Sequence, residues 1–299
     1  KSHFGLFSKC STSFYNRPEN ILVQGGAIVE NEHDGLPRQK HWDAISMFDN
    51  EEIIAQRREL ESSFQRGNEV IYCRPTDVGL KCISTRIDEN NALGGIIEEG
   101  TKGDFYFGKR KRFNRDSKYK NKPASEKIDP EEKRFEAWLI RNALCNNLRL
   151  SMPKDSANLL FVNSQWRFEK LNDEEKKLFA NEKGRQYLDI LAFDIDSGHF
   201  VVVELKKANA KDRGKALQQA QIYCNKLERH ANEFSGFFLA MLKGMIKMYV
   251  DSPTEQKKLT GSLAQFEKNG SVKKFVPCAI EPIGKITAHG IDVQIGRIQ

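Results

Sequence analysis

Long apolar runs, C-x-x-C pairs and internal repeats are all absent from this sequence. No apolar run among the 299 residues approaches the ~18 residues of a membrane span, so we expect no membrane partner. Neither the six cysteines nor the six histidines show zinc-ligand spacing. We therefore expect reduced thiols and a cytoplasmic location. No signal peptide is visible, and a chain that starts at Lys1 rather than Met is expected to lack its natural N-terminus.

Two apolar runs, residues 187–195 and 200–206, are rich in Val, Ile, Leu and Phe and are typical of strands. The Asp-Ser-Gly sequence at residues 196–198 is a turn signal between them, which predicts a β-hairpin. A two-residue loop within this turn would pair Asp196 with His199.

The predicted hairpin brings three charged side chains together. Successive side chains of a strand point to opposite faces, so Glu204 and Lys206 share one face. The same register sets Asp189 opposite Lys206, with its Cβ atom roughly 5 Å away. Two acids and a lysine are therefore expected in one patch.

Such a patch favours a divalent cation. Two carboxylates at this separation repel, and burial pushes each toward its protonated form unless a cation lies between them. Mg²⁺ prefers one or two carboxylates together with water and phosphate oxygens, so Asp189 and Glu204 are candidate Mg²⁺ ligands, with Mn²⁺ as a substitute. Lys206 offers three donors that suit an attacking water or a phosphate.

Glu-x-Lys alone carries little information, because the chain contains it four more times in polar runs. Only Glu204 follows an apolar strand and has an acid upstream on another such strand. The alternative is a surface Glu/Lys pair on a half-exposed sheet, whereas the nearly continuous apolar runs favour strands covered on both sides. The other pairs are Glu131/Lys133, Glu174/Lys176, Glu175/Lys177 and Glu255/Lys257.

A capping signal at residues 129–132 predicts a helix that runs to about residue 147. Glu136 falls on its apolar side, together with Leu139 and Ile140. A carboxylate there is either a site residue or an edge residue whose stem packs while its head reaches water.

A second helix is predicted over residues 211–233. Gln219 and Tyr223 lie one turn apart within its apolar stripe. Gln can bridge a carboxylate and a water or phosphate, and a Tyr hydroxyl can donate to a nucleic-acid backbone. The alternative is a packed Tyr beside a surface Gln.

The expected elements follow the order α-β-β-β-α-β. They are a helix at 129–147, strands at 159–168, 187–195 and 200–207, a helix at 211–233 and a strand at 237–241. With Asp189 and Glu204-Leu205-Lys206, this order resembles the PD-(D/E)XK nuclease superfamily. The form G-x-x-x-L-D-[IL]-L…VVxELK, followed by Gln-x-x-x-Tyr on a helix, is most similar to its RecB-type and NucS-like endonuclease branches. The resemblance covers residues 128–245, and Leu188 replaces the proline of the superfamily's name.

The resemblance implies a restriction-endonuclease-like αβββαβ core and a divalent-metal site. Within it, Asp189 and Glu204 bind the metal, and Lys206 acts on the water or the scissile phosphate. An acid on the first helix, Glu136 by position, assists the metal site.

The resemblance also gives the helical pair a role. Gln219 and Tyr223 are implied to support the active site. The spacing between Lys206 and this helix leaves Gln218 or Gln221 as alternatives to Gln219.

The length of the chain exceeds the usual ~100 to 200 residues of one domain, so we expect two. The fold class is α/β (α+β), with a nuclease core at 128–250 and its extension at 251–299. Residues 1–108 are expected to form a separate mixed α/β domain, helical near 41–67 and β-rich over 70–108. Its role, substrate recognition or oligomerisation, is inferred from position alone.

Positive charge is concentrated in residues 109–122, which hold eight Lys or Arg and one Asp, so this segment carries as much net charge as the whole chain, +7. We expect a basic linker or loop at 109–127. Alone it is typical of a solvated linker, but beside a nuclease motif it favours contact with nucleic-acid phosphates. The expected contacts are Lys109, Arg110, Lys111, Arg112, Arg115, Lys118 and Lys120.

The sequence thus predicts a Mg²⁺-dependent DNA endonuclease that hydrolyses phosphodiester bonds. DNA is favoured over RNA by the resemblance alone, so an RNase on the same fold is one alternative. A non-catalytic nucleic-acid-binding or assembly subunit is another. A homodimer or larger assembly would suit cleavage of both strands.

Overall fold

The computed structural model describes residues 35–51, 53–55, 57–58, 71–76, 79–84, 96–97, 130–153, 158–168, 186–284 and 294–298. The chain divides into two compact units, Lys1–Glu32 and His33–Gln299. Every described residue belongs to the second unit, which is a mixed α/β structure.

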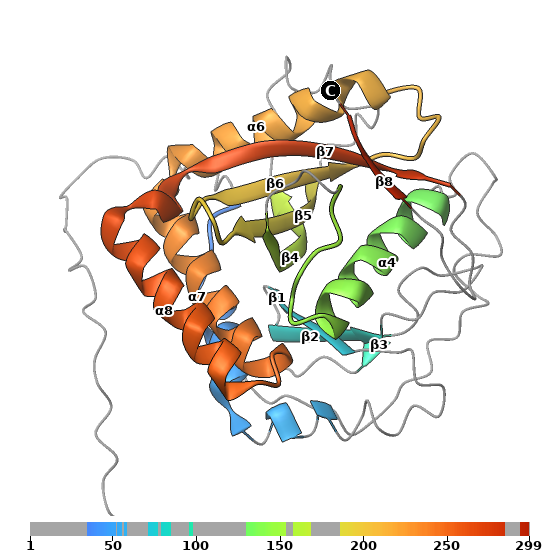
Figure 1. Ribbon diagram of the computed structural model, residues 1–299. Coiled ribbons are helices and arrows are strands. Elements are labelled where there is room, and N and C mark those ends of the chain that lie inside the picture. Colours follow the sequence, from blue (N-terminus) through green and yellow to red (C-terminus); the bar gives the residue numbers. More distant parts are fainter. Residues whose placement is uncertain are drawn as a thin grey trace, which may run out of the picture. The chain divides into compact units, whose positions relative to one another are not determined.

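A five-stranded mixed sheet forms the centre of this unit (Figure 1). Its strands, in spatial order, are β4 (Leu159–Phe168), β5 (Gln186–Asp194), β6 (Phe200–Leu205), β7 (Phe275–Ile283) and β8 (Gln294–Arg297). The β6–β7 pair is parallel and the other three pairs are antiparallel. A parallel pair needs a long crossover, and the three helices between β6 and β7 supply it.

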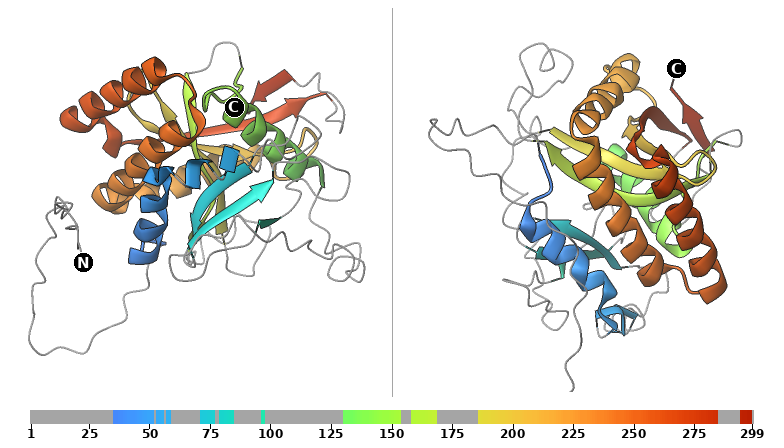
Figure 2. Two further views of the ribbon diagram at one scale, coloured as in Figure 1. Left: turned by 90° about the horizontal axis from the view of Figure 1, so that it is seen from below. Right: turned by 90° about the vertical axis from the view of Figure 1, so that its left-hand side faces the viewer.

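Helices lie on both sides of the sheet, with α6 (Ala216–Arg229) above it and α4 (Pro130–Cys145) below it in Figure 1. The crossover continues through α7 (Ala231–Tyr249) and α8 (Pro253–Asn269), which pack side by side in Figures 1 and 2. All six residues of β6 are buried. The apolar runs of the sequence therefore predicted covered strands correctly, because a strand covered on both faces has no solvent side to be polar.

A second, three-stranded sheet comes from the region before residue 108. It consists of β1 (Ile71–Thr76), β2 (Gly79–Ser84) and β3 (Ile96–Ile97), and is preceded by α1 (Gln39–Ser46) and the 3₁₀ turn η1 (Met47–Asp49). The Tyr72 hydroxyl donates to Asn163 Oδ1 at 2.9 Å, and the Tyr249 hydroxyl accepts from the Cys73 N–H at 3.0 Å.

These residues share one hydrophobic core with the main sheet. Phe48 and Tyr72 are both fully buried within the cluster that also contains the apolar residues of β4 to β7. The described parts of residues 35–97 thus belong to the same unit as the main sheet. The expected linker, residues 109–127, lies outside the described residues, and the separate role of residues 1–108 stays a prediction.

The strand expected at residues 237–241 is wrong, because these residues lie inside α7. Their sequence, Phe-Phe-Leu-Ala-Met, is a short apolar run that suits a strand or a buried helix equally. The buried positions Phe234, Phe238, Met241 and Met245 recur at helical spacing. The next strand along the chain after α6 is β7, which follows the two further helices α7 and α8.

The expectation of reduced thiols is also wrong in one case. Cys145, Cys224 and Cys278 form no disulfide, whereas Cys73 is disulfide-bonded. Cys82 lies opposite Cys73 in the β1–β2 ladder, a neighbour that a search for C-x-x-C spacing does not find. Within the described ranges, no helix has the length and apolar character needed to cross a membrane.

Candidate active site

The β5–β6 hairpin differs in register from the sequence prediction. Phe193 pairs with Phe200 and Ile190 with Val203, a register in which His199 lies opposite Asp194 and not opposite Asp196. The turn is longer than two residues because the Asp194 carboxylate accepts hydrogen bonds from the Asp196 N–H and the Ser197 hydroxyl.

The difference amounts to two residues, so it leaves every side chain on its predicted face. Continued past Ile190, the ladder would set Asp189 opposite Glu204 and Leu188 opposite Leu205. The predicted position of Asp189 opposite Lys206 is therefore wrong by one step along the same face.

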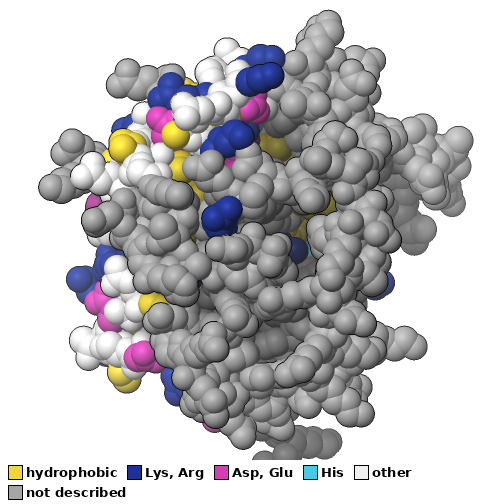
Figure 3. Space-filling model, turned by 90° about the vertical axis from the view of Figure 1, so that its right-hand side faces the viewer, with side chains coloured by type: hydrophobic (Ala, Val, Ile, Leu, Met, Phe, Trp, Pro, Cys, Tyr) yellow, Lys and Arg dark blue, Asp and Glu magenta, His cyan; other side chains and the backbone are white. Residues whose placement is uncertain are grey.

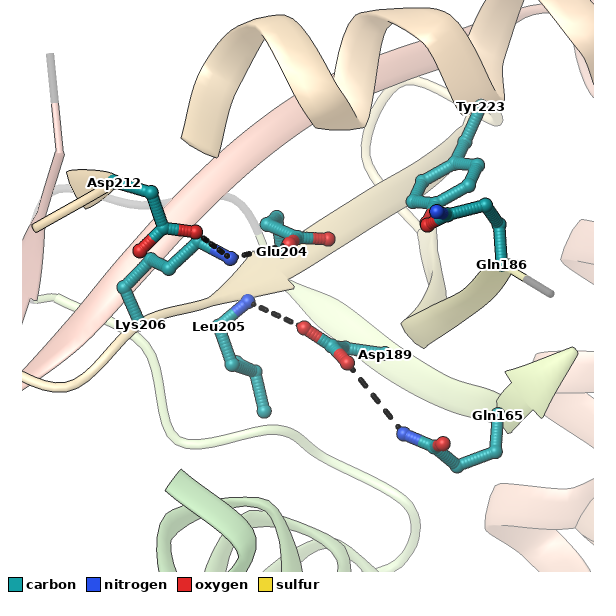
Figure 4. Close-up of polar contacts among 8 residues, drawn as sticks. All are labelled: Gln165, Gln186, Asp189, Glu204, Leu205, Lys206, Asp212 and Tyr223. Atoms are coloured by element: carbon teal, nitrogen blue, oxygen red, sulfur yellow. Dashed lines mark hydrogen bonds and ion pairs between the residues drawn. The ribbon is translucent and has the colours of Figure 1, made fainter. Parts of the chain in front are cut away.

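The two strands separate at this point. The ladder ends at Ile190 and Val203, and the Leu205 N–H donates to Asp189 Oδ2 at 2.9 Å where the ladder would offer a main-chain carbonyl (Figure 4). β6 continues beside β7, where the Lys206 N–H donates to the Ile280 carbonyl at 3.1 Å. The half-buried Asp189 side chain is thus held where the pairing of β5 and β6 ends.

Glu204 and Lys206 lie side by side on β6 and just beyond it, as predicted (Figure 4). Each residue is 6% exposed. The Lys206 Nζ lies 2.8 Å from Glu204 Oε1 and 3.3 Å from Asp212 Oδ2. The alternative of a surface Glu/Lys pair on a half-exposed sheet is therefore wrong, since both side chains are buried.

Burial and neighbouring charge shape the ionisation of this pair. Burial raises the pKa of Glu204 well above its usual value, the charge of Asp189 raises this pKa further, and Lys206 offsets part of the effect. Burial alone would lower the pKa of Lys206, but the charges of Glu204 and Asp212 outweigh it and raise the pKa. Glu204 is thus repelled by Asp189 and attracted by Lys206, and the Lys206 ammonium lies between Glu204 and Asp212.

Glu136 of α4 is 1% exposed, so its head does not reach water. It accepts a hydrogen bond of 2.9 Å from Gln165 Nε2, and the same nitrogen lies 3.4 Å from Asp189 Oδ1. Gln165 therefore links the helix acid to the strand acid. The backbone of Gln165 has a φ of +54°, a left-handed conformation that residues other than glycine rarely adopt. Such backbone strain is found at functional sites.

On α6, Gln219 and Tyr223 are each 2% exposed, so the alternative of a surface Gln is wrong. Gln218 and Gln221 are exposed, which leaves Gln219 as the inward-facing residue. Tyr223 lies close enough for the charges of Glu204 and Asp189 to raise its pKa, although burial is the larger cause. Its hydroxyl donates to Gln186 Oε1 at 3.0 Å.

Sequence reasoning missed three residues of this site. Gln165 stands in a polar run within a buried strand, a signal that was available. Asp212 lies in the loop after β6, and its contact with Lys206 depends on the path of that loop in the folded chain. Glu132, one turn before Glu136 on α4, contributes negative charge that raises the pKa values of Glu204 and Lys206.

The predicted metal ligands were Asp189, Glu204 and Glu136. In the part of the chain that the structure describes, no group of three or more His, Cys, Asp or Glu is arranged to hold a metal ion. Asp189 and Glu204 do interact, and two carboxylates with water and phosphate oxygens satisfy Mg²⁺. The donor set therefore fits a Mg²⁺ site made by two acids, with Glu136 joined to it through Gln165.

The other predicted contacts, the basic residues between Lys109 and Lys120, lie outside the described residues. Comparison with known proteins adds no relative, since no family model, curated protein or solved structure matches this chain.

Proposed function

We propose that this chain is a metal-dependent nuclease of the PD-(D/E)XK type that hydrolyses phosphodiester bonds in DNA. The observation that carries the proposal is the convergence of Asp189, Glu204 and Lys206 where β5 and β6 separate. Burial raises the pKa of Glu204 and the charge of Asp189 raises it further, and acids perturbed in this way cluster at functional sites.

The order of the elements supports the same proposal. Leaving aside α7 and α8, the chain runs α4, β4, β5, β6, α6 and β7, which is the αβββαβ order of a restriction-endonuclease-like core. The antiparallel β4–β5–β6 arrangement followed by a parallel β7 agrees with that core.

In the proposed reaction, Asp189 and Glu204 hold Mg²⁺ or Mn²⁺, which when bound lowers the pKa of water and stabilises charge on the phosphate oxygens. Lys206 donates hydrogen bonds to the attacking water or to a phosphate oxygen. Gln165 and the Leu205 N–H fix the Asp189 carboxylate, and Glu136 orients Gln165. These fixed donors reduce the reorganisation needed in the transition state.

The proposal is tested by incubating the protein with labelled single-stranded, duplex, branched and supercoiled DNA and with RNA, in Mg²⁺, Mn²⁺ or EDTA. We expect metal-dependent cleavage of DNA that is lost in Glu204→Ala and Lys206→Ala. Glu255→Ala and Lys257→Ala provide a matched control, because they remove the same Glu-x-Lys spacing from helix α8. Cleavage of RNA alone would support the RNase alternative, and cleavage that survives in both site variants would overturn the proposal.

A second candidate is a nucleic-acid-binding or assembly subunit without catalysis. The observation that favours it is the ion pair between Lys206 and Glu204, which already gives this carboxylate a cation. In that case no substrate would be cut under any condition, while Glu204→Ala would leave nucleic-acid binding unchanged.

Two-strand cleavage would require two sites and hence a homodimer, which sedimentation of the DNA-bound protein detects.

A further inference from the structure

The β6–α6 loop, residues 206–215, places positive charge beside the candidate site. It contains five Lys or Arg and one Asp. Two of the basic residues are held by acids: Lys206 by Glu204 and Asp212, and Arg213 by Glu281 through hydrogen bonds of 2.5 and 2.6 Å. Glu281 belongs to β7, so these pairs fasten the loop to the sheet at both of its ends.

Lys211 and Lys215 differ from these residues. Both are exposed, and neither forms an ion pair with any residue that the structure describes. On α7, by contrast, Lys243 pairs with Glu267 and Lys247 with Asp49. The β6–α6 loop therefore presents two uncompensated ammonium groups on an anchored backbone.

Both lysines lie close to the site through Asp212, which neighbours Lys211 in sequence and whose carbonyl accepts from the Lys215 N–H at 2.8 Å. The Oδ2 atom of Asp212 is 3.3 Å from Lys206 Nζ, and neighbouring Cα atoms are about 3.8 Å apart, so the Cα atom of Lys211 lies within about 11 Å of the Lys206 ammonium. Duplex DNA carries about one negative charge per 1.7 Å of its axis, so several phosphates fall within that radius. Figure 3 shows Lys and Arg side chains, with some Asp and Glu among them, towards the top of this face.

We propose that Lys211 and Lys215 bind backbone phosphates of duplex DNA next to the scissile phosphate, while Arg213 and Asp212 hold the loop that presents them. This proposal rests on the proposed function, and it identifies the part of the substrate that the loop contacts, namely the DNA backbone. The contacts are to phosphates and so are independent of base sequence.

The test is the salt dependence of DNA binding, measured by fluorescence anisotropy of a labelled duplex in EDTA, so that no cleavage is needed. The double variant Lys211→Gln/Lys215→Gln is compared with wild type and with Lys257→Gln/Lys258→Gln, which removes two exposed lysines from α8. Loss of two phosphate contacts lowers the slope of log affinity against log salt by about 1.8. Between 50 and 200 mM salt, wild type should then lose about twelvefold more affinity than the loop variant.

The α8 variant should keep the wild-type slope. Equal slopes in all three proteins, or no binding of DNA by wild type, would overturn the assignment of this loop. A reduced slope in a protein that cuts no substrate would support the loop surface and refute the nuclease. Cleavage with equal slopes would do the reverse, so the two proposals fail separately.

Discussion

At the scale of single residues, the candidate site is a balance between two acids and one base. The pKa of Glu204 is raised by burial and by Asp189, and the Lys206 ammonium partly offsets the repulsion. In the absence of a divalent cation, Lys206 acts as an internal counterion. Lys206 also lies 3.3 Å from Asp212, so it would keep a second partner if Glu204 bound the proposed metal.

Replacing Lys206 with Met tests this balance, because Met keeps the packed stem and removes the charge. Removing one member of a buried pair costs about 3 kcal/mol of unfolding free energy. Added Mg²⁺ should restore part of the loss, since a ligand that binds only the folded state stabilises it by about 2.7 kcal/mol at a hundred times its Kd. We expect Mg²⁺ to raise the Tm of Lys206→Met by about 5 °C more than that of wild type.

Lys257→Met on α8 is the control, and its Tm should respond to Mg²⁺ as wild type does. Equal Mg²⁺ shifts in wild type and Lys206→Met would show that Lys206 does not compete with the cation.

Asp212→Asn addresses the second partner of Lys206. Without this carboxylate, cation binding must break the Lys206–Glu204 pair with no replacement, and one negative charge near the cation is lost. Both effects weaken Mn²⁺ binding, by about tenfold for one charge at several ångströms. Isothermal titration with Mn²⁺ measures the change. Asp212→Glu should recover most of the Mn²⁺ affinity. Asp251→Asn is the control, because the Asp251 side chain is 88% exposed, and it should leave the affinity unchanged. An unchanged affinity in Asp212→Asn would contradict the role of Asp212.

At the scale of elements, local pattern predicted what depends on neighbours in sequence. The strand period put Glu204 and Lys206 on one face, and the helical period brought Gln219 and Tyr223 together. The register was missed by two residues, because hydrogen bonds of the Asp194 side chain lengthen the turn. Asp212 was missed because its contact with Lys206 is set by a loop path that no short pattern encodes, whereas Gln165 stands in a polar run that could have been noticed, although its partner Asp189 is set by strand order. The α7 segment was misassigned, because five apolar residues do not distinguish a helix from a strand.

The contact between β1 and β4 depends on the Tyr72 hydroxyl, which donates to Asn163 Oδ1 and accepts from the Ser164 N–H at 3.0 Å. Tyr72→Phe would remove both bonds and leave the Ser164 N–H and Asn163 Oδ1 only the 2.8 Å bond that they make with each other, so it should cost about 1–2 kcal/mol of unfolding free energy at pH 7. Burial raises the pKa of Tyr72 to about 12, whereas the unfolded value is about 10.

The sign of the pH effect follows from these two values. Above about pH 10 the unfolded chain loses the Tyr72 proton while the folded chain keeps it, so the stability that Tyr72 contributes is present below pH 10 and declines toward pH 12. The stability difference between wild type and Tyr72→Phe should therefore shrink by about 2 kcal/mol between pH 8 and pH 11.5. Urea unfolding of both proteins at pH 8, 10 and 11.5 measures it. A difference that is constant with pH would contradict a buried, neutral Tyr72.

At the scale of the whole molecule, the site is built on a core that includes the region before residue 108. The Tyr72 ring packs on Phe161 with centroids 5.3 Å apart, and Trp42 packs on Phe237 at 5.2 Å. Arg57 donates to the Met248 carbonyl at 2.7 Å. Strands β4 to β6, which hold the carboxylates in place, thus gain part of their support from α1 and β1.

A chain that begins at residue 128 should therefore fail to form a stable core, although it contains every predicted catalytic residue. Removing α1 and β1 uncovers the apolar side chains beneath them, and loss of specific packing leaves a compact state that binds ANS and lacks near-UV circular dichroism. A chain of residues 33–299 should instead unfold in one cooperative transition, because it retains the whole second unit. If the chain that begins at 128 unfolded cooperatively with the same urea midpoint, the main sheet and its helices would be independent of the region before them, and the boundary near residue 108 would be a true domain boundary.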